Sequence, residues 1–166
     1  MRASLATARK RLEIQGFIGL SDDEVRMFNY WLRLAPAICL AWIVLGVSSG
    51  SGLILGLLIP FELLGAITKG HPFDLIYNHA IRHWFGLPKL PEYGVPRRFA
   101  FLMASMMTGI TATLFALGIS NVPYFLGGMM MLVASLQVVT GLCGPALIYR
   151  LLFDPIRPAI EQERDA

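Results

Sequence analysis

Apolar residues along the chain fall into two long blocks, and a polar stretch at residues 69–98 separates them. The first block covers residues 34–68 and the second covers residues 99–153, and each is interrupted once by a short run of turn-forming residues. A membrane-spanning helix needs roughly 20 predominantly apolar residues. The pattern therefore predicts an all-α membrane protein with four transmembrane helices in two hairpins.

The first predicted hairpin covers residues 21–68. Ser21 and Glu24 have the spacing of a capping box, which predicts a helix start at Asp22. The apolar part of this helix, residues 34–47, is short for a span, so residues 27–32 are expected to supply its interfacial end. Pro36 predicts a kink. Residues 48–51 predict a turn, and residues 52–68 a second span.

The second predicted hairpin covers residues 99–153. One span is expected at residues 99–119, a turn at residues 120–123, and a fourth span at residues 124–153 with a bend near Gly144 and Pro145. The ends of the chain differ from the hairpins. Residues 1–20 are basic and partly amphipathic, which fits either a segment on an anionic membrane surface or a solvated tail. Residues 154–166 predict a charged, irregular tail.

The bridge between the hairpins, residues 69–98, predicts a short amphipathic helix that lies on the membrane surface. Its apolar residues recur at helical spacing, and polar residues occupy the other side. The apolar set is Phe73, Ile76, Tyr77, Ala80, Ile81 and Trp84, and the polar set is Asp74, Asn78, His79, Arg82 and His83.

The placement of basic residues predicts the orientation. Six of the 14 Lys and Arg residues precede residue 34, five lie in the bridge and three follow residue 149, whereas the two turns carry none. Under the positive-inside rule, both termini and the bridge are cytoplasmic. This placement also explains the net charge of +3 without nucleic acid, which we exclude as a partner. Membrane lipids are the first partners that the pattern implies.

The composition supports a membrane location. Hydrophobic residues make up 55% of the chain and charged residues only 15%, with a mean hydropathy of +0.60. A soluble domain of 166 residues needs more charge on its surface. The two cysteines, Cys39 and Cys143, lie inside apolar runs and form no paired motif.

All three histidines lie in the bridge and are the first candidates for chemistry. His79 and His83 are four residues apart, so on a helix they share a face and could hold a cofactor. Asp74 or His71 could add a third metal ligand. The alternative is that they are polar residues of an interfacial helix, because no general base accompanies them as in a metalloprotease motif. The pattern identifies no particular cofactor.

Three polar residues within the predicted spans are further candidates: Glu62, Cys143 and Gln137. Glu62 is the only ionisable residue well inside an apolar run, and such residues are often functional. It could equally pair with Lys69, Arg98 or Arg150, and we favour that structural interpretation. Gln137 fits helix packing better than a pathway.

Three motifs carry a resemblance: HPFDLIYNHAIRHWFG in the bridge, PRRFAF after it, and GLCGPALIYRLL near the end. They resemble an uncharacterised bacterial family of four-helix membrane proteins, a domain of unknown function. The resemblance implies the fold and a location in the bacterial inner membrane, but no reaction. Family members often carry a C-x-G-C motif; Cys143 matches the first cysteine, and Ala146 replaces the second. Thiol–disulfide exchange, which needs two thiols, is therefore not expected within one chain.

Three functions fit these observations, and we favour a non-enzymatic one. The first is an accessory, assembly or stabilising subunit of a larger inner-membrane complex, with other membrane-protein subunits as partners; a small-residue lateral face and the lack of an internal cavity would distinguish it. The second is a redox or cofactor-binding protein at the cytoplasmic face that uses His79, His83 and Cys143. The third is a small transporter, for which the polar residues in the spans are few.

Overall fold

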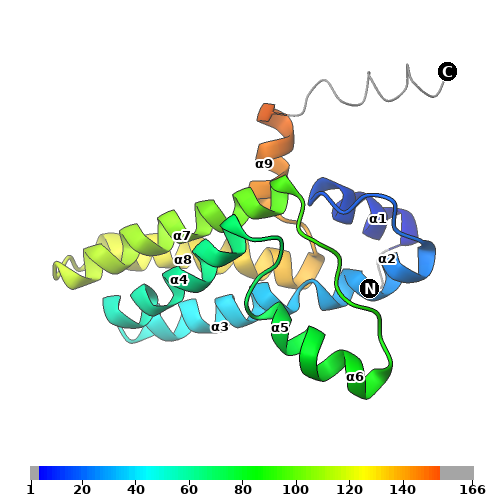
Figure 1. Ribbon diagram of the computed structural model, residues 1–166. Helices are drawn as coiled ribbons and strands as arrows, with labels where there is room; N and C mark the ends of the chain where they lie inside the picture. Colours follow the sequence, from blue (N-terminus) through cyan, green and yellow to red (C-terminus); the bar gives the residue numbers. More distant parts are fainter. Residues whose placement is uncertain (1–3, 154–166) are drawn as a thin grey trace.

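The computed structural model describes residues 4–153, and all regular structure in them is helical (Figure 1). The helices in chain order are α1 (Leu5–Ile14), α2 (Asp22–Trp31), α3 (Leu34–Ser48), α4 (Gly52–Ile67), α5 (Asp74–Ile76), the π-helix η1 (Tyr77–Ile81), α6 (Arg82–Phe85), α7 (Val95–Ala116), α8 (Asn121–Thr140) and α9 (Gly144–Phe153). The predicted tail, residues 154–166, lies outside the described residues.

The four longest helices form a bundle (Figure 1). Helix α4 packs against α3 and α7, and α8 packs against α3 and α7, so the helices make a closed ring of antiparallel neighbours. Three helical segments are long and apolar enough to cross a membrane: Asp22–Ser48, Val95–Ala116 and Asn121–Thr140. Helix α4 is apolar but has only 16 residues. These properties are typical of a membrane protein.

The end of the bundle at residues 48–51 and 117–120, which we call the turn end, is held by close contacts at glycines. A side chain on Gly52 of α4 would collide with the carbonyl oxygen of Ala112 in α7, and one on Gly127 of α8 would collide with Val47 of α3. Small residues let helices approach closely, which is how helices commonly associate in lipid.

The opposite end, which we call the bridge end, carries the bridge, α1 and α9 (Figure 1). The predicted capping box is present, since the Ser21 side chain accepts from the Glu24 backbone N–H and the Glu24 carboxylate accepts from the Ser21 N–H. The interpretation of residues 1–20 as a solvated tail does not describe α1. Ala8, Leu12 and Phe17 are buried in the core, so this segment is part of the packed fold.

The fourth predicted span differs from the structure. Helix α8 ends at Thr140, Gly141 has a positive φ of 76°, and α9 starts only at Gly144. Helix α9 then leaves the direction of α8 and packs on α7 (Figure 1). The sequence analysis placed the bend a few residues late, because Gly141 in the left-handed conformation already ends the helix.

Arginines at the bridge end bind the last carbonyl groups of three helices. Arg33 donates to the carbonyls of Val138 and Val139 at the end of α8 over 3.0 and 2.7 Å. Arg98 donates to the end of α4, at Ala66 and Ile67, and Arg150 donates to the end of α1. The last carbonyls of a helix lack partners within it and favour cations. These basic residues therefore stabilise the packing of the helices, and their positions also follow the positive-inside rule.

The bridge forms the predicted helix, with a π-helical turn inside it that the sequence pattern did not indicate. Phe73 and Tyr77 are buried, and the Tyr77 ring lies 5.0 Å from the Trp31 ring. Trp84 and Phe85 at the far end of the helix are 81% and 67% exposed. The apolar side therefore faces the bundle at one end only.

Candidate functional site

A cavity of about 230 Å³, which is half open to the outside of the bundle, lies between α3, α7 and α8. Its walls are mostly apolar and include four methionines: Met103, Met107, Met129 and Met130. Four side chains with polar groups also line it: Cys39, Glu62, Arg97 and Gln137. Apolar walls with a few polar groups are typical of sites for small molecules.

Arg97 stands at the bridge end of this cavity, in the first turns of α7, and is only 1% exposed. Its guanidinium donates to the Gln15 side chain and to the Leu32 carbonyl, whereas its Nε makes no hydrogen bond. The guanidinium also lies over the ring of Tyr93, 4.6 Å from the centroid. No carboxylate in the described residues forms an ion pair with it. A positive charge is therefore buried beside the cavity with only neutral acceptors directly bonded to it.

Gln15 connects this arginine to the break between α8 and α9. Its amide nitrogen donates to the carbonyl of Gly141 over 3.0 Å and to that of Arg11 over 3.1 Å. Because the Gln15 oxygen accepts from Arg97, one buried side chain joins α1, α7 and the end of α8. The buried hydrogen bonds at this end thus form one connected network.

Glu62 projects from α4 into the cavity wall and is 1% exposed. Its Oε2 has no hydrogen-bond partner of ordinary geometry, and neither has the Oγ1 of the fully buried Thr108 in α7, although the Thr108 hydroxyl lies near enough to the Glu62 carboxyl to interact with it. The expected pairing with a basic residue is not observed: Lys69 binds Glu92, and Arg98 binds the carbonyls that end α4. An unpartnered buried polar atom is costly, so this oxygen invites a hydrogen-bonding ligand or water.

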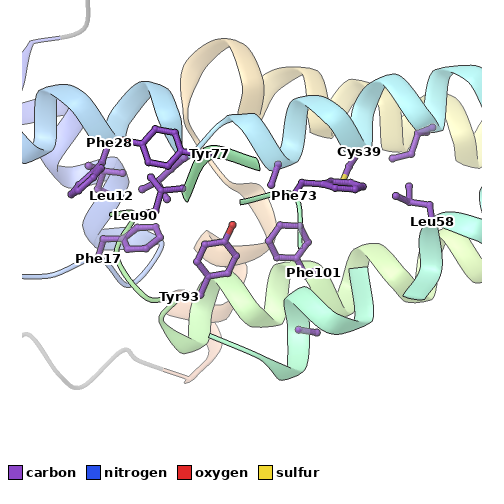
Figure 2. Packing of buried hydrophobic residues seen from close by; sticks show 14 of the residues in the cluster. Leu12, Phe17, Phe28, Cys39, Leu58, Phe73, Tyr77, Leu90, Tyr93 and Phe101 are labelled. Carbon is purple, nitrogen blue, oxygen red and sulfur yellow. The ribbon is translucent and has the colours of Figure 1, made fainter. Parts of the chain in front are cut away.

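His71 contacts Cys39 at the edge of the same region. The backbone N–H of Phe73 donates to Nδ1 of His71 over 3.2 Å, which places the imidazole proton on Nε2. Nε2 then lies 3.9 Å from the Cys39 sulfur, and Figure 2 shows the Phe73 ring beside that residue. Burial, together with the nearby charge of Arg97, lowers the pKa of His71 to about 4. His71 is therefore neutral at physiological pH and does not titrate there.

Asp74 lies next to His71 and is 4% exposed. One carboxylate oxygen accepts the backbone N–H of His71 over 3.2 Å, and the other makes no hydrogen bond. Burial raises the pKa of Asp74, while Tyr93 and Arg97 oppose that shift. Asp74 and His71 line a second pocket of about 370 Å³, which lies outside the bundle at the end of α4.

The structure does not gather the histidines. His79 and His83 are exposed, and His79 makes a hydrogen bond of 3.1 Å with the Leu75 carbonyl, while His71 is buried. Within residues 4–153, no three His, Cys, Asp or Glu side chains stand close enough to hold a metal ion. The predicted roles of His79 and His83 gain no support from this geometry.

Of the three polar residues predicted within the spans, Glu62 and Gln137 line the cavity, and Cys143 is buried but does not. The sequence analysis missed Cys39 and Arg97 as site residues, and it named Asp74 only as a possible third metal ligand. Arg97 was interpreted only as a charge at the end of a span. The available signal was spacing, since Tyr93 and Phe101 stand four residues before and after it and both rings lie near its guanidinium.

Residues 29–153 match a family model described as "Domain of unknown function (DUF4395)". The chain belongs to this family. The match covers the four bundle helices, the bridge and the residues that line the cavity, and it confirms the resemblance that the bridge motifs indicated. No curated protein and no solved structure matches the chain. Any function must therefore be argued from the site.

Proposed function

We propose that the chain crosses the bacterial cytoplasmic membrane four times, with both termini and the bridge in the cytoplasm. Helix α4 is shorter than the other three proposed spans. It is about 24 Å long at 1.5 Å per residue, whereas the hydrocarbon core is roughly 30 Å thick. It is apolar and packs between two longer spans, so a slight local thinning of the bilayer would accommodate it. The 14 basic residues all lie on the cytoplasmic side in this arrangement.

The function that the geometry supports best is the binding of a small lipid-soluble molecule that carries a hydrogen-bonding group. The observation behind this proposal is that Glu62 and Arg97, both 1% exposed, leave polar atoms without partners beside a largely apolar cavity. Buried polar groups in proteins nearly always have partners. A ligand with an apolar body and one polar group would fill the apolar cavity and give these buried polar atoms a hydrogen-bonding partner.

The cavity is placed to receive such a molecule from the bilayer. Met129 of α8, Met103 of α7 and Val133 of α8 line the cavity and are also exposed on the outside of the bundle, at 48%, 37% and 42%. The wall between α7 and α8 is therefore a single layer of flexible or small side chains. Methionine adapts its shape readily, which suits a wall that a ligand must pass.

Purification from native membranes in mild detergent, followed by solvent extraction and mass spectrometry, tests this proposal. We expect a lipid-soluble molecule at roughly one per chain in the unaltered protein. Ala134→Phe places a ring in the cavity and should abolish its recovery, whereas Ala116→Phe changes an exposed alanine of the same bundle outside the cavity and should not. Equal recovery from both variants, or no bound molecule in the unaltered protein, would refute the proposal.

An accessory role in a larger membrane complex remains the second candidate. Only Pro123 and Gly127 of the 20 residues in α8 are buried, and the outer face includes Phe125, Leu132 and Val139. Lipid or a neighbouring subunit must cover this face. A cavity lined by buried polar side chains favours the ligand-binding role over it. The same purification separates the two, because a stoichiometric protein partner without a bound small molecule would support the accessory role.

A further inference from the structure

The polar side chains that line the cavity between α3, α7 and α8 all lie toward the bridge end. Each stands no more than five residues from the point where its helix begins or ends there, which is about 8 Å along the helix axis. These side chains are Cys39, Glu62, Arg97 and Gln137. Deeper in the bundle, the cavity is lined by apolar residues such as Ile43 and Met107. A bound molecule therefore has its polar group toward the bridge end, and the charge at that end determines which polar groups fit.

Arg97 carries the one permanent charge among these four side chains, and the protein surrounds it closely. Its guanidinium donates to the Gln15 side chain and to the Leu32 carbonyl. Three aromatic rings have their centroids 5.5, 4.6 and 5.9 Å from the guanidinium carbon, and they belong to Phe17, Tyr93 and Phe101. Figure 2 shows these three rings in a row. Contacts of a cation with aromatic rings stabilise a desolvated charge but do not neutralise it.

Asp74 supplies the counter-charge from the other side of Tyr93. The Tyr93 hydroxyl is buried between the Asp74 carboxylate and the Arg97 guanidinium and interacts with both of them. Burial raises the pKa of Tyr93, so its hydroxyl keeps the proton and can donate it in a hydrogen bond to the carboxylate. Tyr93, the Arg97 charge and the backbone N–H of His71 all favour the ionised form of Asp74. One buried cluster therefore contains both a cation and the anion that balances it.

Glu62 adds no further charge to this end of the cavity. Neither ion pair within residues 4–153 includes Glu62, and a carboxyl group that is buried in hydrocarbon without a cation takes up a proton. A protonated carboxyl group both donates and accepts hydrogen bonds, as the amide of Gln137 does. These two side chains can therefore bind an uncharged hydroxyl or carbonyl group.

We infer that the ligand of this cavity is an uncharged amphiphile, with a hydroxyl or carbonyl group at the bridge end and an apolar chain toward the middle of the bundle. The inference rests on the proposed function, because it names the chemical class of the ligand at the same site. An anionic group would add a charge that no cation is left to balance, and an unbalanced buried charge is strongly unfavourable. Removing the charge of Asp74 would leave Arg97 unbalanced, and the cavity should then accept an anion.

Binding of two molecules with the same chain, hexadecanol and palmitate, tests this inference. Each is tritiated in turn, and its binding to the purified full chain in mild detergent is measured by scintillation proximity at about pH 9, where the carboxyl group of palmitate is ionised. We expect hexadecanol to bind the unaltered protein at least tenfold more tightly than palmitate. Ala134→Phe, which fills the cavity, should abolish this binding.

Asp74→Asn tests the balance of charge directly. We expect this variant to bind palmitate at least tenfold more tightly than the unaltered protein does, so that the preference for hexadecanol is lost or reversed. Glu92→Gln is the matched control, because Glu92 is an exposed acid of the same bridge that pairs with Lys69 and does not line the cavity. This control should keep the preference for hexadecanol.

Two outcomes would overturn the inference and leave the proposed function in place. The first is palmitate binding to the unaltered protein as tightly as hexadecanol, a measurement that needs no variant to fold. The second is a preference for hexadecanol that persists in Asp74→Asn. If neither molecule binds, or if Ala134→Phe binds them as the unaltered protein does, the proposed function itself is refuted and the inference with it.

Discussion

The two ends of the bundle are held together by different interactions. At the turn end, Gly52 lets α4 approach the backbone of α7, Gly127 leaves room for the Val47 side chain, and no charged residue lies in either turn. At the bridge end, the buried Arg97 and Gln15 are hydrogen-bonded to each other, and the buried Asp74 accepts the backbone N–H of His71. Close apolar contact is enough where helices only need to pack. Directional bonds are needed where α1, the bridge and the α8–α9 break must keep fixed positions around two pockets.

The direction of the helices contributes to this difference. Helices α4 and α8 end at the bridge end, so their unpaired carbonyl groups and negative dipole ends lie there. Arg98 and Arg33 bind these carbonyls. At the turn end, serine hydroxyls donate to the last carbonyls of α3 instead, as Ser48 does to Val44 over 2.6 Å. Charged side chains thus bind the helix carbonyls at the bridge end, whereas hydroxyl groups do so at the turn end.

The largest effect is expected at Arg97. Arg97→Leu leaves the Gln15 oxygen and the Leu32 carbonyl buried without a donor, and we expect a loss of about 3–5 kcal/mol in the free energy of unfolding. Denaturation in detergent micelles, followed by tryptophan fluorescence, measures it. Arg98→Leu, one residue along the same helix but half-buried, should cost about 1 kcal/mol. Similar losses for both variants would contradict the special role of the buried network.

The second-largest expected effect is a pH dependence of the free energy of unfolding, which arises from a buried histidine at the bridge end. Burial lowers the pKa of His71 to about 4 from an ordinary value of 6.5, so the unfolded chain takes up the proton first as the pH falls. The free energy of unfolding should therefore have its full value above pH 6.5 and should fall by on the order of 3 kcal/mol as the pH is lowered to 4. Asp74, whose pKa is raised, acts in the opposite sense, because protonation favours its folded form.

Unfolding measurements between pH 7 and pH 4 test this dependence against two histidine variants. His71→Asn should flatten the decline, because it removes the group that titrates. His83→Gln changes an exposed histidine of the same bridge and should keep the decline. A decline that persists in His71→Asn would show that another group carries it.

A smaller effect is expected at the turn end. Gly52→Ala places a methyl group against the Ala112 carbonyl, so α4 and α7 must separate, at a cost of about 1–3 kcal/mol. Gly56→Ala, one helical turn further, meets no atom within 4 Å and should be neutral or slightly stabilising. Thermal unfolding of both variants measures the difference. A cost at Gly56 equal to that at Gly52 would mean that close contact does not hold this end.

The smallest expected effect is local. Ser21→Ala removes half of the capping box at the start of α2 and should cost about 1 kcal/mol. Because this cap lies outside the Arg97 network, its effect should add to that of Arg97→Leu. Unfolding of the double variant measures the sum, and a deviation of more than about 0.5 kcal/mol would show that the network is coupled to the start of α2.

Sequence analysis predicted the helices better than the site. The apolar blocks, the turns and the capping box at Ser21 reflect interactions within one segment, so their patterns are visible in the chain itself. Glu62 and Gln137 were found because a polar residue stands out inside an apolar run. Asp74 and Arg97 stand among other polar residues, and nothing local distinguishes them from exposed ones.

The sequence by itself determined that this protein is helical, which segments are apolar enough to cross a membrane, and where its basic residues concentrate. Only the tertiary structure decided that Arg97 and Asp74 are buried, that α9 leaves the direction of α8, and that two pockets flank the bridge end. The physical reason is the separation along the chain of the residues that interact. Periodicity and capping act between residues a few positions apart, whereas the Gln15–Arg97 and His71–Cys39 contacts join residues 82 and 32 positions apart. Such contacts exist only once the helices have packed.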